Sequence, residues 1–203
     1  MTLFRVLVFV FSFSALPVSA AEDVGAVDRA RGETTAVQQS AMRSLSTGSS
    51  VQFMDTLRTG DQSRLQVTFK DGSELVLGDR SELNVDEMVY DPGAQGRGVL
   101  RLTKGVFRLV SGQVNKIPGG TLAVVTPMAT IGVRGTDFWG EQSADQLKMA
   151  LLDDGELTIT TKDGTVTLSD PMTIVVIDKG KAPGTVSKLS QKQLVQAMAT
   201  ISW

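Results

Sequence analysis

The chain has 203 residues, of which 41% are hydrophobic and 21% are charged, with 20 basic residues against 22 acidic ones. This near-neutral balance argues against an electrostatic footprint for nucleic acid or anionic lipid. Cysteine and histidine are both absent, which excludes a disulfide framework, a thiolate nucleophile, a lipidated cysteine, histidine-dependent catalytic triads and Cys- or His-based metal chemistry.

Residues 1–21 are predicted to be a cleaved secretory signal peptide. Arg5 and the free amine form a positive start, residues 6–13 are nearly all apolar, and small residues follow at the expected cleavage site. An uncleaved anchor is the less favoured alternative, because the apolar stretch is shorter than the roughly 20 residues that span a bilayer. Cleavage leaves 19 basic against 22 acidic residues, a charge near −3. We therefore expect a periplasmic chain with no integral membrane segment after cleavage.

Residues 22–50 are expected to be a loosely ordered N-terminal segment. The segment is rich in Ala, Ser, Thr, Gln and Gly and has few large apolar residues. This composition favours an edge strand followed by a loop that contributes little to the core.

Residues 51–186 are predicted to form one β domain, because apolar residues alternate with polar ones and the runs end at turn sequences. Leu65, Val67 and Phe69 precede the turn Lys70-Asp71-Gly72-Ser73, and apolar alternation resumes after it. The same pattern surrounds Lys162-Asp163-Gly164-Thr165. The fold class is therefore all-β, as a short twisted β-solenoid-like or sandwich-like stack of antiparallel strands, and the pattern alone does not choose between these two forms.

Residues 187–203 are predicted to form an amphipathic C-terminal helix. Ser190 and Gln193 have capping-box spacing, and Leu194, Met198 and Ile201 fall on one face. We expect the helix to cap the end of the β stack. The alternative is a partner-docking helix anchored by its C-terminal tryptophan.

A stretch from Thr126 to Phe138 joins an apolar run to the turn Gly132-Val133-Arg134-Gly135-Thr136, an order that packing alone does not require. Together with the upstream motifs 55–60, 70–73, 81–83 and 104–108, it resembles the FecR domain over roughly residues 51–165. The resemblance implies an extracytoplasmic, solenoid-like β module that binds or signals without catalysis.

Signalling members of this family carry a cytoplasmic anti-sigma region and a transmembrane helix ahead of the β domain, whereas this chain is expected to have a signal peptide there. The resemblance therefore implies a free periplasmic protein that does not contact a sigma factor itself. The expected partner is another envelope protein, for which the chain would serve as a binding, signalling or scaffolding module.

The candidate binding or fold-locking residues are Gly132, Arg134, Gly135, Thr136 and Trp139. The glycines on either side of the arginine indicate tight backbone geometry, and a positive φ or a close backbone approach is expected at the second one. The arginine is expected to point inward, to strand-end carbonyls or to the nearby Asp137, and so to lock the fold. The alternative is that it faces a partner.

No cofactor or metal is expected, and an enzyme is disfavoured. The acidic residues that remain for catalysis are a cluster at 153–156 and the pair Asp137 and Glu141, which are more typical of solvated turns. The alternative function is a carbohydrate or cell-wall ligand-binding module, in which Tyr90, Phe138 and Trp139 would stack on sugar rings.

Overall fold

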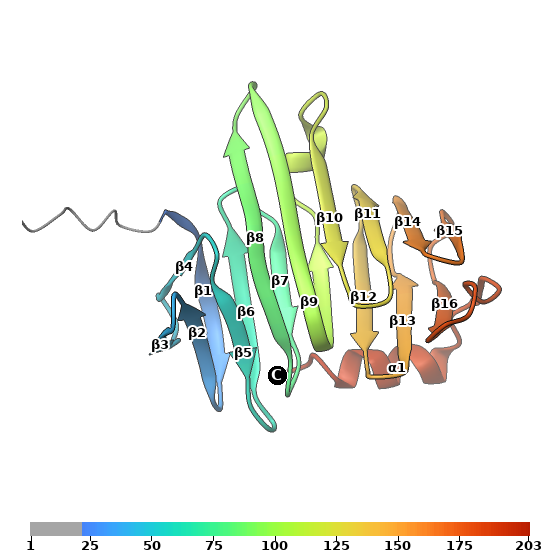
Figure 1. The fold of residues 1–203 in the computed structure, drawn as a ribbon, viewed down its shortest axis with the longest axis horizontal. Helices are drawn as coiled ribbons and strands as arrows, with labels where there is room; N and C mark the ends of the chain where they lie inside the picture. The colour runs from blue at the N-terminus through green and yellow to red at the C-terminus, as the bar shows by residue number, and fades with distance from the viewer. Residues whose placement is uncertain (1–21) are drawn as a thin grey trace, which may run out of the picture.

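The computed structural model describes residues 22–203, so the predicted signal peptide lies outside the described residues. The described chain is almost entirely β-structure, with one short 3-10 helix, η1 (Val114–Lys116), and one α-helix, α1 (Gln191–Ala199). Its 17 strands form one network of hydrogen-bonded pairs. Chain order follows the long axis of the molecule, from the N-terminal strands at one end to β15 and β16 at the other (Figure 1). The all-β prediction is confirmed.

The strands form two layers that face each other across the core. Layer A contains β1 (Asp23–Arg31), β4 (Ser50–Gln52), β6 (Arg64–Phe69), β7 (Glu74–Leu77), the second part of β9 (Gln95–Val110), β12 (Asp137–Gln142), β13 (Gln146–Leu151), β16 (Thr173–Asp178) and β17 (Ser187–Lys188). Layer B contains β2 (Thr34–Gln38), β3 (Ala41–Ser44), β5 (Thr56–Thr59), β8 (Glu82–Asp91), the first part of β9, β10 (Thr121–Val125), β11 (Thr130–Arg134), β14 (Glu156–Thr161) and β15 (Gly164–Leu168).

The chain alternates between the two layers as it advances. From β6 onward it adds strands to one layer and then crosses to the other, so the molecule combines a sandwich-like section with solenoid-like progression. Pairing is antiparallel except between β9 and β10. Each crossing must turn the backbone sharply at an end of the strands, and the polar residues of the turn sequences gather there.

The long strand β9 makes one of these crossings at Gly105. Residues before it pair with β8 in layer B, and residues after it pair with β7 and β12 in layer A. Gly105 has φ of +100°, and a Cβ there would lie 2.4 Å from the Cα of Ser81. Both the conformation and the space therefore require glycine.

The core lies between the layers and follows the period-two alternation of the sequence. Leu65, Val67 and Phe69 are buried in layer A, and their apolar counterparts in layer B are buried opposite them. Phe107 and Phe138 meet edge to face with ring centroids 5.6 Å apart. Two hairpins predicted from the Lys-Asp-Gly turns, β6–β7 and β14–β15, are present.

The N-terminal segment differs from the loosely ordered one expected. It forms β1 to β3, and Val24, Val27 and Ala36 are buried in the main core. β1 pairs with β4 and β6, and β2 pairs with β3 and β5. Backbone hydrogen bonds to neighbouring strands do not require large apolar side chains, so the composition of this segment concealed its strands.

Helix α1 begins with the predicted capping box: Ser190 accepts from the backbone of Gln193, whose side chain accepts from the backbone of Ser190. The helix packs on the outer face of layer A, against a second apolar cluster. This differs from the expected position over the end of the stack. Beyond the helix, Arg29 of β1 lies 4.3 Å over the Trp203 ring. Within residues 22–203, no helix is long and apolar enough to cross a membrane.

Candidate functional site

The stretch from Thr126 to Phe138 connects one end of the strands to the other and then changes layer. At its start, the Thr126 hydroxyl accepts from the backbone N–H of Ala129 at 3.0 Å, which closes the turn between β10 and β11. At its end, Gly135 has φ of +56° and carries the chain from β11 in layer B to β12 in layer A. Of the two features expected at Gly135, the positive φ is confirmed, and no atom lies within 4 Å of a Cβ placed there.

Thr136 fixes this second turn to two other crossings. Its backbone N–H donates to the Ser111 hydroxyl at 2.8 Å, and its own hydroxyl donates to the Asp153 carbonyl at 3.1 Å. A Cβ on Gly155 would lie 2.4 Å from the Gly135 carbonyl oxygen, so the next crossing passes directly against the turn. Thr136 is buried and structural, whereas Gly135 is exposed.

Arg134 is exposed on the outer face of layer B, at the end of β11. The arginine that binds Asp137 is instead Arg108 on the neighbouring strand β9, whose Nε and Nη2 donate to the two carboxylate oxygens. This bidentate contact raises the pKa of Arg108 further above its ordinary value. The inward position expected for Arg134 is wrong, because β11 ends in layer B and Asp137 begins β12 in layer A.

Arg134 and Gly132 line a shallow groove of about 320 Å³ on layer B. Around them lie residues of β10, β14 and the segment that follows η1, including Thr121, Thr158 and Glu156. Asn115 also lines this groove, but its amide nitrogen is buried and has no hydrogen-bond partner among residues 22–203. The exposed Arg134 guanidinium therefore offers N–H donors in this groove, which suit carboxylate or carbonyl oxygens of a ligand.

Trp139 is only 3% exposed and lies under α1, where its indole N–H donates to the Thr200 hydroxyl at 3.1 Å. Phe138 is fully buried in the core. Neither ring can stack on a sugar, and the glycan-binding alternative loses two of its three aromatic residues. Tyr90 remains half-buried on β8.

The expected acidic pair is also engaged in other contacts. Asp137 is held by Arg108, and Glu141 accepts from Lys148 at 2.8 Å. Within the described part of the chain, no group of three or more acidic residues is placed to hold a metal ion.

Comparison with known proteins decides the family. The sequence profile described as FecR protein matches residues 55–167, more than half of the chain. The chain belongs to the FecR family. No curated protein matches it. Two crystal structures, at 2.50 and 1.65 Å resolution, of a protein from Parabacteroides distasonis ATCC 8503 described as a candidate anti-sigma factor are similar in fold. For each, the TM-score is 0.56 at 14% identity, with 69% of this chain and 62% of that chain covered.

Several FecR motif positions of this chain are internal supports that the sequence pattern did not identify as such. Asp71 is 1% exposed, and its carboxylate accepts from the Ser73 N–H at 2.9 Å, the Ser73 hydroxyl at 2.7 Å and the Val114 N–H at 3.2 Å. Ser73 in turn accepts from the Gly112 N–H at 2.8 Å. These contacts tie the β6–β7 turn to the crossing between β9 and β10.

Two further FecR motif positions support other crossings. Ser81 is buried, and its hydroxyl accepts from the Val106 N–H at 2.9 Å, which holds β9 at its change of layer. Asp55 is fully buried and binds the Arg43 guanidinium, which joins the N-terminal strands to the rest of the domain. Buried acids and serines do not contribute to the alternation of apolar residues. The short polar motifs that contain them were therefore the one sequence signal that could have identified these supporting residues.

Proposed function

We propose that this FecR-family protein is a noncatalytic protein-binding module of the cell envelope that acts in signalling or scaffolding. The observation that carries the proposal is the exposed Arg134, whose side chain lines a groove at the end of β11. Most other residues of the family's motifs support the fold internally, so this arginine is free to meet a partner. The P. distasonis protein of similar fold is described as a candidate anti-sigma factor, which supports a signalling class.

The face beside Arg134 suits a protein surface. It consists of the outer sides of β10, β11, β14 and β15, and it carries mostly short uncharged side chains, among them Thr121, Thr130, Thr158, Thr160, Thr165 and Thr167. A flat surface of threonines has little side-chain entropy to lose on binding, and the arginine at its margin supplies a charged contact. The predicted signal peptide at residues 1–21 supports a periplasmic location.

Cross-linked capture from the source cell's envelope fraction tests the partner. Wild-type protein and the Arg134→Glu variant are compared, and Arg31→Glu serves as the matched control because Arg31 is an exposed arginine on layer A. We expect one defined envelope protein to be captured by wild type and by Arg31→Glu, and to be lost with Arg134→Glu. Equal capture by all three proteins, or capture of no defined protein, would contradict the proposal.

The location is tested separately. N-terminal sequencing of the protein from fractionated cells should find a mature start near residue 22 in the periplasmic fraction. A retained Met1, or a protein that remains with the membrane after carbonate extraction, would contradict the periplasmic assignment.

A further inference from the structure

A second groove lies away from Arg134, at the opposite end of β11. Its volume is about 680 Å³, within the range of ligand sites in proteins. Three segments line it: the β10–β11 turn at 126–130, the β14–β15 turn at 160–163, and the end of β16 with its following loop at 177–181. Both layers therefore contribute to its walls.

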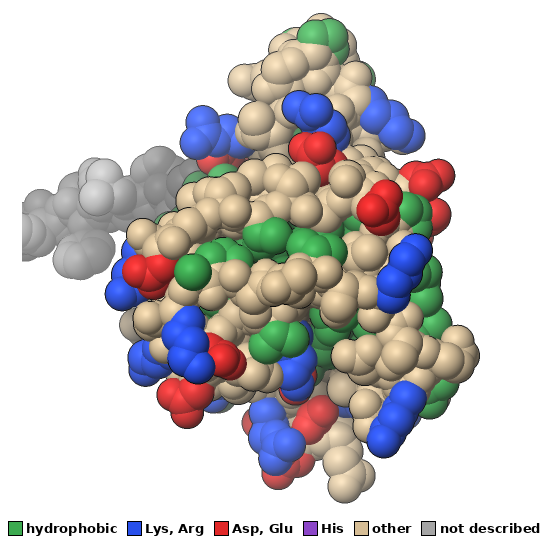
Figure 2. Space-filling view, turned by 90° about the vertical axis from the view of Figure 1, so that its right-hand side faces the viewer, with side chains coloured by type: hydrophobic (Ala, Val, Ile, Leu, Met, Phe, Trp, Pro, Cys, Tyr) green, Lys and Arg blue, Asp and Glu red, His purple; other side chains and the backbone are tan. Residues whose placement is uncertain are grey.

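The groove has an apolar floor. Ala129 and Ile177 are buried in the core, Met128 packs against it, and Pro127 completes the lining. At this end of the molecule, apolar side chains are visible in the seam between the layers, with lysine and arginine side chains near its margins (Figure 2). An apolar side chain of a ligand would be removed from water on such a floor, at about 25 cal/mol per Å² buried.

The rim of the groove is basic. Lys162, Lys179 and Lys181 line it and are exposed. Lys162 lies 3.6 Å from Asp163, and Lys181 lies 3.1 Å from Asp178, but Lys179 makes no ion pair among residues 22–203. Three lysines and two acids line the groove, and Asp145 lies beside the loop at 177–181, so Lys179 is the lining lysine that no acid of residues 22–203 pairs with.

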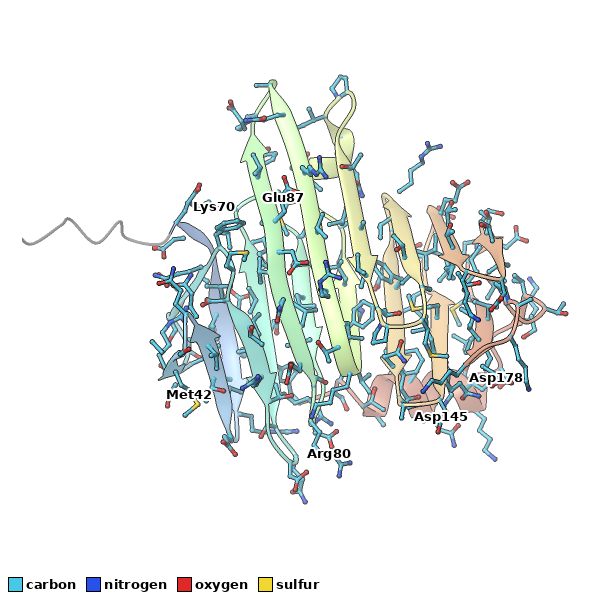
Figure 3. The ribbon with its side chains drawn as sticks, in the orientation of Figure 1. Met42, Lys70, Arg80, Glu87, Asp145 and Asp178 are labelled. Carbon is cyan, nitrogen blue, oxygen red and sulfur yellow. The ribbon has the colours of Figure 1, made fainter. Side chains whose placement is uncertain are left out.

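The loop that carries Lys179 and Lys181 is held in place. The Lys179 backbone N–H donates to the Asp145 carbonyl at 2.9 Å, and Asp178 accepts from the Gln146 amide at 2.9 Å. Asp145 and Asp178 lie at the same corner of the molecule, near the lower ends of β13 and β16 (Figure 3). A fixed loop presents the lysine ammonium groups with less loss of conformational freedom on binding.

We propose that this groove binds an acidic peptide segment of a partner protein, with one or two apolar side chains on the floor and carboxylates at the lysine rim. The hydroxyl groups of Thr130 and Thr160 border the groove and can bond to peptide N–H and C=O groups, which an acyl chain lacks. The ligand class rests on the proposed protein-binding function. The groove shares Thr130 and Thr160 with the threonine face, but its lysine rim lies at the end of β11 opposite Arg134, so substitutions of Arg134 and of the rim lysines test the two proposals separately.

The test measures fluorescence anisotropy of a labelled Glu-Leu-Glu-Leu-Glu peptide with purified chain lacking residues 1–21. The same peptide with Gln for Glu removes the charge, and one with Ser for Leu removes the apolar contacts. The groove variant is Lys179→Glu with Lys181→Glu. The matched control is Lys70→Glu with Lys192→Glu, two exposed lysines outside the groove that give the same change in net charge. Thermal melts confirm that every variant is folded.

We expect the Glu-Leu peptide to bind the wild-type chain at least about tenfold more tightly than either altered peptide does. Its affinity for the groove variant should be at least about tenfold lower than for wild type, because two attractive charge pairs become repulsive. The control variant should keep its Kd within about twofold, and added salt should weaken binding. Absence of binding, or equal loss with both variants, would overturn the proposal. Competition with dodecanoate is the last arm of the test. If dodecanoate displaces the bound peptide and its own Kd is lower than that of every peptide, the groove binds an acyl chain and the proposal is overturned.

Discussion

The two Lys-Asp-Gly turns have nearly the same sequence, but their aspartates should differ widely in their contribution to stability. Asp71 is buried and accepts three hydrogen bonds from Ser73 and Val114. Asp163 is exposed, and its carboxylate lies 3.6 Å from Lys162. Substitution of each aspartate by alanine therefore compares one turn sequence in two tertiary environments.

The magnitude follows from the donors that Asp71→Ala leaves without an acceptor. The backbone N–H groups of Ser73 and Val114 lose the carboxylate, and an unsatisfied buried donor costs about 1–3 kcal/mol. For the two donors together we therefore expect a loss of roughly 2–6 kcal/mol, which is a large fraction of the usual 5–15 kcal/mol stability of a domain. At about 2–4 °C per kcal/mol for a chain of this size, the melting temperature should fall by roughly 4–24 °C. Asp163→Ala should change stability by less than about 0.5 kcal/mol.

Urea titration and thermal melting followed by circular dichroism measure both variants, with Asp71→Asn as an intermediate that keeps one acceptor oxygen. An unchanged m-value would show that the difference reflects stability and not a change in unfolding cooperativity. An Asp71→Ala stability within about 1 kcal/mol of wild type, or similar losses for the two alanine variants, would contradict the structural role of Asp71.

Three further outcomes are expected. Arg108→Ala should lower the free energy of unfolding by about 1–3 kcal/mol because it leaves the largely buried Asp137 unpaired, whereas Arg134→Ala should lower it by under about 0.5 kcal/mol. Comparable losses in urea titrations would contradict the pairing of Asp137 with Arg108. Gly135→Val should destabilise the fold by about 1–3 kcal/mol because valine resists a positive φ, whereas Gly132→Ala, with its nearest contact at 3.8 Å, should be nearly neutral in thermal melts. Hydrogen bonds from Gln146 and Lys181 lower the pKa of Asp178, so its small stabilisation is present above the unfolded pKa and is lost as pH falls through the lower folded pKa. A carboxyl NMR titration that gives an ordinary aspartate pKa would refute it.

The sequence predicted those features that depend on neighbouring residues. Alternation of apolar residues indicated the strands, Asp-Gly pairs indicated the hairpin turns, and Ser190 with Gln193 indicated the helix start. Each of these is a short-range property, because side-chain period, turn dihedrals and capping hydrogen bonds involve residues only a few positions apart. The positive φ at Gly135 was predicted for the same reason.

The tertiary structure alone decided which of these local features meet. It paired Asp137 with Arg108 instead of Arg134, because β11 and β12 lie in different layers while β9 and β12 are neighbours. It placed Trp139 under α1, where its indole bonds to Thr200, a residue 61 positions away in the sequence. It also buried Asp71 through Val114, 43 positions away, and left Asp163 exposed in a turn of the same kind. Burial and partner choice depend on such long-range contacts, and these arise only when the crossings between the two layers place distant segments side by side.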